Sequence, residues 1–320
     1  MTKITSSLLL AALLALCLHV ASAQAQLVRT CVSMAKGSDA NAASSCHCTT
    51  PCRTFATAHN NTLSDGEITV LDPGDYGGLT ITKSISINND SGGEASVTVS
   101  ENTTGIIVNA PATGYVNLRG ITIQGVGAGG TGLRFNTGFA LTLTNCVIRN
   151  HTGAGIDFHP SGNSNLSVSN TLVADNGGSG IFVQPAGGSD VTVKAVFNRV
   201  EAYNNSTQGI NVNGLSTTGR VNATVADSVA AGNGTVGFFV ISDAGRAATS
   251  LMVVRSVAAN NGFGLAAQGV PATLRVGQST VTGNTTTFFT LGGAGLSSYG
   301  DNNIAGNGDG DPALGTIVKK

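Results

Sequence analysis

The chain lacks tryptophan and carries little charge. Only 10% of its 320 residues are Asp, Glu, Lys or Arg, and the formal net charge is −1. Nucleic-acid binders need clustered Lys and Arg to neutralise phosphates, so this composition excludes a binder of the usual basic kind. Four Tyr and no Trp leave few aromatic platforms for a saccharide. The sequence has instead 44 Gly and regularly recurring aliphatic residues, which argue against disorder.

Long hydrophobic runs are also missing, apart from one near the start. Leu8 to Val20 is apolar except for His19, and Ala21-Ser22-Ala23 and Ala23-Gln24-Ala25 each fit a small-residue cleavage site. The run is too short for a membrane anchor and no stop-transfer charge follows it. We therefore predict a signal peptide over residues 1–25, no membrane span, and a secreted or periplasmic mature protein.

Cysteine is scarce and clustered. After removal of the signal peptide, four of the five remaining cysteines fall within one short stretch: Cys31, Cys46, Cys48 and Cys52. In an exported protein this clustering predicts disulfides that tie down an N-terminal cap, residues 26–60. Cys46 and Cys48 are too close to pair with each other, so each is expected to pair with Cys31 or Cys52. The alternative is a metal site that combines these thiolates with His59.

A glycine-anchored repeat runs through most of the chain. Seven glycines recur at spacings of 23 to 29 residues: Gly105, Gly132, Gly155, Gly180, Gly209, Gly237 and Gly264. Each is followed by two apolar residues that flank one variable residue, which is typical of a strand with one buried face. A second alternating run follows in each period, as at Leu141 and Leu143. No helical stripe is evident. Short strands at this period indicate a parallel β-solenoid.

The stretch 66–87 supplies a family resemblance. Its Ile68-Thr69-Val70, Pro73-Gly74-x-Tyr76 and Leu79-Thr80-Ile81 resemble the first coil of right-handed parallel β-helix proteins of the pectate-lyase-like superfamily. The resemblance covers roughly residues 52–307. Pro51 to Phe55 also resembles small secreted bacterial β-helix proteins without an established activity. We therefore expect an all-β fold: a single-stranded right-handed parallel β-helix of about nine or ten coils over residues 61–310, followed by a tail, 311–320.

The motifs of the family's enzymes are absent. The chain has no Asp-Asp pair, no Gly-His-Gly and no Arg-x-Lys, and glycoside hydrolysis ordinarily requires two carboxylates. We predict an exported surface, envelope or matrix module that binds a polysaccharide or cell-envelope component. The alternative is a polysaccharide lyase or glycoside hydrolase acting on the outer face. We predict no cofactor and no metal, since Asp301, Asp309 and Asp311 near the C-terminus match no calcium motif and are interpreted as a capping turn.

Two columns of side chains should point outward from the first strand of each coil. The position four residues after each glycine gives a mostly polar column: Asn109, Asn136, His159, Gln184, Asn213, Ile241 and Gln268. The position two residues earlier gives a second column: Ile107, Arg134, Asp157, Phe182, Asn211, Phe239 and Ala266. Arg134 and Asp157 fall on adjacent coils, so a cross-strand ion pair is expected, with His159 beside it.

These columns have two interpretations. The first is a polar ladder, amide stacked on amide, that aligns the coils. The second is a functional face, with a candidate catalytic patch of Arg134, Asp157 and His159, and with binding residues Phe182, Gln184, Asn211 and Asn213.

Two further positions carry expectations. Cys146 shares a column with Thr171, Arg199 and Ser228 and is expected to face outward, unless a loop covers it or it bridges two molecules. Pairs such as Asp175-Asn176 and Asn204-Asn205 are interpreted as turns, because Asn and Asp tolerate left-handed backbone.

Overall fold

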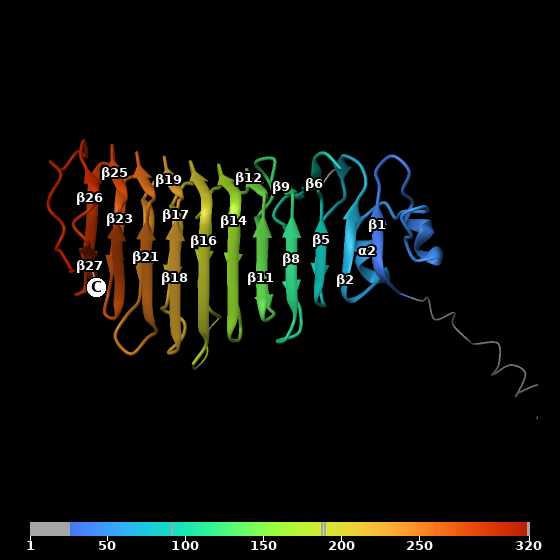
Figure 1. Cartoon of the computed structure of the whole chain (residues 1–320), viewed down its shortest axis with the longest axis horizontal. Helices are drawn as coiled ribbons and strands as arrows, with labels where there is room; N and C mark the ends of the chain where they lie inside the picture. Colours follow the sequence, from blue (N-terminus) through green and yellow to red (C-terminus); the bar gives the residue numbers. More distant parts are fainter. Residues whose placement is uncertain (1–25, 91, 187, 189, 319–320) are drawn as a thin grey trace, which may run out of the picture.

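The strands stack in parallel along one axis and form a β-solenoid (Figure 1). This computed structural model describes residues 26–90, 92–186, 188 and 190–318. The signal peptide predicted for residues 1–25 lies outside the described residues. The predicted all-β parallel solenoid is confirmed.

One face of the solenoid is a nine-stranded sheet, and each coil adds one strand to it. Its members are β4 (Leu79–Ile81), β7 (Thr104–Asn109), β10 (Thr131–Thr137), β13 (Ile156–Phe158), β15 (Ile181–Val183), β17 (Gln208–Asn213), β20 (Val236–Ile241), β23 (Phe263–Gln268) and β26 (Thr286–Leu291). Inward side chains from these strands are the aliphatic and Phe residues of the repeat, and they line the core.

The other faces belong to a nineteen-stranded sheet, in which two rows of strands merge through β14 and β16. The first row comprises β1 (Leu27–Val32), β2 (Thr62–Val70), β5 (Ile85–Asn88), β8 (Tyr115–Arg119), β11 (Ala140–Thr144), β14 (Ser164–Ala174), β16 (Thr192–Tyr203), β18 (Arg220–Ala226), β21 (Ala248–Val254), β24 (Ala272–Gly277) and β27 (Gly295–Ser298). The second row adds β3 (Gly74–Asp75), β6 (Ala95–Thr98), β9 (Ile121–Gln124), β12 (Val147–Arg149), β19 (Val229–Ala231), β22 (Val257–Ala259), β25 (Thr280–Thr282) and β28 (Asn303–Ile304).

The solenoid makes about eight complete turns, because eight steps separate the nine strands from β4 to β26. The prediction of nine or ten coils is therefore slightly too high. The described chain before β4 and after β26 contributes strands to the nineteen-stranded sheet alone, so the coil at each end is incomplete.

A disulfide-bonded cap covers the N-terminal end (Figure 1). Cys31 pairs with Cys48 and Cys46 pairs with Cys52, so these four thiols are not available to a metal. The cap also contains a 3-10 helix, η1 (Asp39–Ser44), and a seven-residue α-helix, α2 (Phe55–Asn61). The α-helix was not expected. It is too short to show a stripe, and Thr54 caps it by accepting a hydrogen bond from the backbone N–H of Thr57.

A ladder of buried asparagines runs through the core at one corner of the coils. Its members are at most 7% exposed: Asn176, Asn205, Asn233, Asn261, Asn284 and Asn307. In the middle of the ladder, Asn233 Nδ2 donates to Asn261 Oδ1 at 2.9 Å and to the Ala202 carbonyl at 3.1 Å. Its Oδ1 accepts from Nδ2 and the backbone N–H of Asn205. Every donor of the amide is satisfied, so one side chain per coil fixes the spacing and register of its neighbours.

Five of the seven anchor glycines face an amide of this ladder. A Cβ on Gly180 would lie 2.7 Å from Asn205 Nδ2, and one on Gly209 would lie 2.9 Å from Asn233 Nδ2. Real Cβ atoms do not approach other atoms so closely, and the amides cannot move without breaking their bonds. The repeat therefore has glycine at this position because the asparagine of the next coil fills the space.

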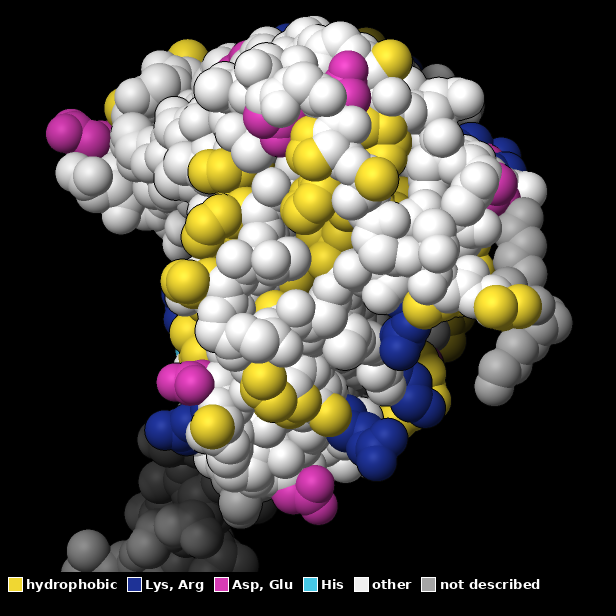
Figure 2. All heavy atoms as spheres, turned by 90° about the vertical axis from the view of Figure 1, so that its left-hand side faces the viewer, with side chains coloured by type: hydrophobic (Ala, Val, Ile, Leu, Met, Phe, Trp, Pro, Cys, Tyr) yellow, Lys and Arg dark blue, Asp and Glu magenta, His cyan; other side chains and the backbone are white. Residues whose placement is uncertain are grey.

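The ends of the ladder differ from its middle. At the N-terminal end, His151 takes the equivalent place, and its backbone N–H donates to Asn176 Oδ1. At the C-terminal end, Asp311 Oδ1 accepts from Nδ2 of Asn307 at 2.8 Å, while Asp309 accepts from Thr287. These two aspartates close the last coil, as the capping-turn interpretation predicted. Figure 2 shows hydrophobic side chains in the middle of this C-terminal end.

The outward orientation predicted for Cys146 is wrong. Cys146 is 3% exposed, and its Sγ lies 3.4 Å from the Thr144 carbonyl oxygen. The preceding residue, Asn145, has a φ of 55°, and this left-handed corner reverses the alternation of side chains. The aligned column is Thr171, Val200 and Ser228, because Thr171 pairs with Val200, and Arg199 occupies the exposed corner instead.

The asparagine ladder should dominate the stability of the coils. We expect Asn233→Ala to lower the free energy of unfolding by about 3 kcal/mol, because it leaves the buried N–H of Asn205 without an acceptor. Denaturant unfolding followed by circular dichroism measures the loss. Asn222→Ala, on the exposed side of β18, is the matched control and should change stability by under about 0.5 kcal/mol. Equal losses in the two variants would contradict a structural role for the ladder.

The burial of Cys146 predicts an unreactive thiol. Burial raises its pKa to about 11, so little thiolate forms near neutral pH. We expect iodoacetamide to label the native protein at least about 100-fold more slowly than the unfolded protein, as followed by intact mass. A disulfide-linked dimer on non-reducing electrophoresis would contradict the buried position.

Candidate functional site

The candidate patch lies on the outer side of the nine-stranded sheet. The strand register places Arg134 of β10 beside Asp157 of β13, then Phe182 of β15, then Asn211 of β17. These four residues therefore form one continuous column across four coils. His159 and Gln184 directly follow β13 and β15, two residues after Asp157 and Phe182, and both are partly exposed.

The predicted ion pair is present. Arg134 Nη1 donates to Asp157 Oδ2 at 2.7 Å, and Arg134 Nε donates to Asn136 Oδ1 at 2.9 Å. The guanidinium is thus held between a carboxylate on the next coil and an amide on its own strand. Its side chain is 40% exposed, which leaves part of the guanidinium accessible from solvent.

Asp157 is buried, unlike the carboxylate of a typical surface ion pair. The residue is 9% exposed, and its Oδ1 atom has no hydrogen-bond partner among the described residues. Burial raises the pKa of this carboxyl, and the nearby charges of Arg134 and His159 oppose the rise without cancelling it. The carboxyl group therefore presents one engaged oxygen and one oxygen that lacks a donor.

A second acceptor without a donor lies on the other side of Phe182. Asn211 is 6% exposed, its Nδ2 donates to Gln208 Oε1 at 3.3 Å, and its Oδ1 has no partner among the described residues. Buried acceptors are nearly always satisfied in proteins, so these two oxygens are exceptions. Asp157 and Asn211 lie on either side of Phe182 in the column, and their unpaired oxygens are covered by the protein.

Other expected or relevant residues have different roles. Asn213 is 8% exposed, and its Oδ1 accepts the backbone N–H of Leu215, so it shapes the following turn. Gln208 was not predicted as part of the site. Its Oε1 accepts hydrogen bonds from Ser179 Oγ at 2.7 Å and from Asn211 Nδ2, so Gln208 holds Asn211 in place. The polar residue before the anchor glycine is the sequence signal that would have found it.

The predicted outer ladder of stacked amides forms between only one pair of adjacent coils among the described residues. Asn136 Nδ2 donates to Asn109 Oδ1 at 2.9 Å, and no further side-chain bond joins that column among the described residues. The amides that align the coils lie inside the solenoid, at the second residue of the pairs that were interpreted as turns. The first residue of each pair does form the turn, as at Asn204, whose φ is 51°.

The chemistry available to the patch is limited. Asp157 is the one acidic residue and Arg134 the one strongly basic residue within the nine strands of this sheet. The part of the chain that the structure describes contains no group of three or more His, Cys, Asp or Glu able to hold a metal ion. Ordinary glycoside hydrolysis uses one carboxyl group as the general acid and another as the base or nucleophile. The single carboxylate of the patch cannot take both roles.

Comparison with known proteins gives a family and a fold. The family model described as "Right handed beta helix region" matches residues 50–250. No curated protein matches the chain in sequence. A pectate lyase, Pel9A, superposes with a TM-score of 0.58 and 16% identity over 89% of this chain and 81% of the lyase. The A-module of the Azotobacter vinelandii mannuronan C-5 epimerase AlgE4 gives 0.51 and 17%, over 80% and 91% of the two chains.

The raised pKa of Asp157 predicts a specific pH dependence. Because this pKa lies above its ordinary value of 3.8, the folded state holds the proton more tightly than the unfolded state. Relative to Asp157→Asn, the wild type should therefore lose stability as the pH rises through the raised pKa, and recover it in more acidic solution. Near neutral pH the two should differ by about 1 kcal/mol or less.

Urea unfolding of both proteins across the acidic pH range measures this difference. Asp243→Asn, in an exposed loop, is the control for a change of carboxylate to amide. A difference between wild type and Asp157→Asn that grows in the opposite direction would show that Arg134, rather than burial, controls the carboxyl.

Proposed function

The chain belongs to the right-handed β-helix family, and on that premise we propose that it is an exported module that binds surface, envelope or matrix material without catalysing a reaction. The observation that carries the proposal is the column Arg134, Asp157, Phe182 and Asn211. It places a cation, an aromatic ring and an amide beside one another on one face, yet it contains a single carboxylate.

The ligand class follows from the chemistry of that column. The accessible polar groups are the Arg134 guanidinium and the partly exposed side chains of His159 and Gln184, which can exchange hydrogen bonds with the hydroxyls of a saccharide. Phe182 lies between Asp157 and Asn211 in the column and is partly exposed, so its ring can contact the C–H groups of a sugar. A polysaccharide or another hydroxyl-rich component of the cell envelope is therefore the partner we propose.

The disulfide bonds support a proposal for the location of the protein. Two disulfides close the N-terminal cap, and such bonds persist in oxidising compartments. Among the described residues, no helix is long and apolar enough to cross a membrane. We propose a secreted or periplasmic location, in which the rod presents its long nine-stranded face to extracellular polymers.

A second candidate is a polysaccharide lyase or glycoside hydrolase that uses an unfamiliar site on the same face. The observation in its favour is the grouping of Asp157, whose pKa is raised, with Arg134 and His159. A raised carboxyl pKa suits a general acid, and an imidazole suits a base. The weakness of this candidate is that the second carboxylate is missing.

One experiment separates the two candidates. The exported chain is assayed against a panel of acidic and neutral polysaccharides, both for retention on immobilised polymer and for release of reducing ends or unsaturated products. We expect retention without turnover. The double variant Asp157→Ala, His159→Ala should lose about tenfold or more in affinity with an unchanged melting temperature, since two polar partners are removed.

The control for this experiment is Asn222→Ala, which changes an exposed amide on the other sheet. It should bind as the wild type does. Turnover that the double variant abolishes would replace the binding module with the enzyme. A lower melting temperature with unchanged retention would assign these residues to the stability of the coils and refute the site.

A further inference from the structure

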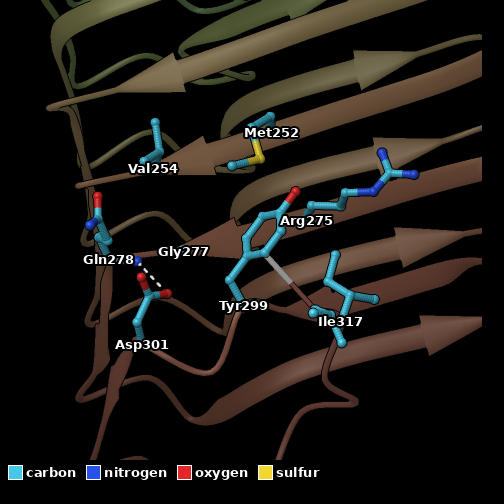
Figure 3. A pocket seen from close by; sticks show the side chains of 9 residues that line it. Met252, Val254, Arg275, Gly277, Gln278, Tyr299, Asp301 and Ile317 are labelled. Atoms are coloured by element: carbon cyan, nitrogen blue, oxygen red, sulfur yellow. Dashed lines mark hydrogen bonds between the residues drawn. The ribbon is translucent and has the colours of Figure 1, made fainter. Parts of the chain in front are cut away.

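A hollow of about 700 Å³ lies at the C-terminal end of the nineteen-stranded sheet (Figure 3). Its walls come from Met252 and Val254 of β21, from Arg275 and Gly277 of β24, and from Tyr299, which follows β27. None of these residues belongs to the candidate patch on the nine-stranded sheet. The volume is within the range of small-molecule sites, about 300–1,000 Å³.

The hollow exists because a glycine interrupts a column of side chains. Gly277 pairs with Val254 on the preceding coil. A residue other than glycine at this position would extend the outward column of side chains that contains Val254. A Cβ on Gly277 would approach Tyr299 Cδ2 to 3.0 Å, so the glycine lets the tyrosine ring lie close to the sheet. In Figure 3 the space over Gly277 opens between Tyr299 and the side chains of Val254 and Met252.

The C-terminal tail forms the remaining wall. The N–H of Ser298 donates to the carbonyl of Gly315 at 2.8 Å, and the N–H of Ile317 donates to the carbonyl of Ser298 at 2.8 Å. These two bonds hold the tail alongside β27 and bring Ile317 to the hollow. The site is thus assembled from segments that lie more than 60 residues apart in the sequence.

The charges at the hollow are separated. Arg275 is exposed, and no ion pair found among the described residues involves it. The carboxylate of Asp301 is already bonded, since its Oδ1 accepts the backbone N–H of Gln278 at 3.0 Å. Figure 3 places Arg275 and Asp301 on opposite sides of Tyr299. The Arg275 guanidinium is therefore available to an anionic group of a ligand.

We propose that this hollow binds a small planar aromatic carboxylate. The aromatic ring stacks on Tyr299 and contacts the Met252 sulfur, both of which favour aromatic partners. The carboxylate pairs with the Arg275 guanidinium, whose planar donors match two carboxylate oxygens. The site is independent of the function proposed above, because it uses neither the residues nor the sheet of the candidate patch.

The lining disfavours a saccharide in this position. Met252, Val254, Ile317, Val318 and the Tyr299 ring supply most of the walls. A sugar ring here would leave several hydroxyls against apolar groups, and unpaired buried polar groups are costly. A flat apolar ring with one anionic group satisfies both the apolar walls and the Arg275 guanidinium.

The test uses the exported full chain and 2-naphthoate as the probe. We expect saturable binding by calorimetry with a dissociation constant on the order of 1 mM or below, the affinity that a ligand of this size can reach. The neutral 2-naphthamide should bind about tenfold more weakly, because it cannot form the ion pair. Glucuronate, which has the charge on a hydroxylated ring, should also bind about tenfold more weakly.

Two substitutions locate the binding. Arg275→Gln and Tyr299→Leu should each weaken naphthoate binding about tenfold, since they remove the ion pair and the stacking face. Arg246→Gln, at an exposed arginine in the loop before β21, is the matched control and should leave binding unchanged. Arg275 is exposed on the outer face, so its variant should keep the wild-type melting temperature and decide the matter even if Tyr299→Leu is unstable.

Several results would overturn this proposal. If no saturable binding is seen with naphthoate at a concentration of about ten times the expected dissociation constant, the site is refuted. Equal affinity of wild type and Arg275→Gln would place any binding elsewhere on the protein. Tighter binding of glucuronate than of naphthoate would refute the aromatic class, without affecting the polysaccharide retention assigned to the nine-stranded face.

Discussion

The buried asparagine ladder is the constraint on which the rest of the structure depends. In the middle of the ladder each amide uses its two N–H groups on the preceding carbonyl and on the next asparagine, and its oxygen accepts two bonds in return. A buried amide with all partners satisfied tolerates no slip of register, because a shifted coil would leave several polar atoms unpaired. The five anchor glycines from Gly155 to Gly264 are a consequence, since their missing Cβ atoms leave room for these amides.

Register in turn creates the candidate surface. Arg134, Asp157, Phe182 and Asn211 are separated by 23 to 29 residues along the chain, yet they lie side by side because every coil is aligned with the next. The solenoid therefore converts a sequence period into a linear array of side chains. An array of this kind suits an extended polymer, whose successive units also repeat along one direction.

The two surfaces discussed above differ in chemistry. The nine-stranded face has the partly exposed ring of Phe182 and the ion pair of Arg134 with Asp157, on which the proposed saccharide binding rests. The C-terminal hollow has apolar walls and an exposed guanidinium, which suits a flat anion. The chain thus combines a surface made by the repeat with a pocket made where the repeat ends, at Gly277 and the tail.

Much of this molecule could be predicted from the sequence, because a repeat constrains backbone and neighbours together. The period alone implied parallel strands, an outward column and the contact of Arg134 with Asp157, since adjacent coils must align like with like. The unpaired oxygens of Asp157 and Asn211 could not be predicted in this way, because they depend on how deeply Phe182 and its neighbours bury them.

The sequence by itself determined the solenoid, the disulfide cysteines and the residues that align along the nine-stranded sheet. Only the tertiary structure decided which way the corner residues face. At Cys146 and at the second asparagine of each pair, a left-handed residue reverses the strand alternation and turns the next side chain into the core. Alternation along a strand cannot be continued through such a corner. The ladder that holds the coils together was therefore visible as a pattern in the sequence, but its place inside the protein was not.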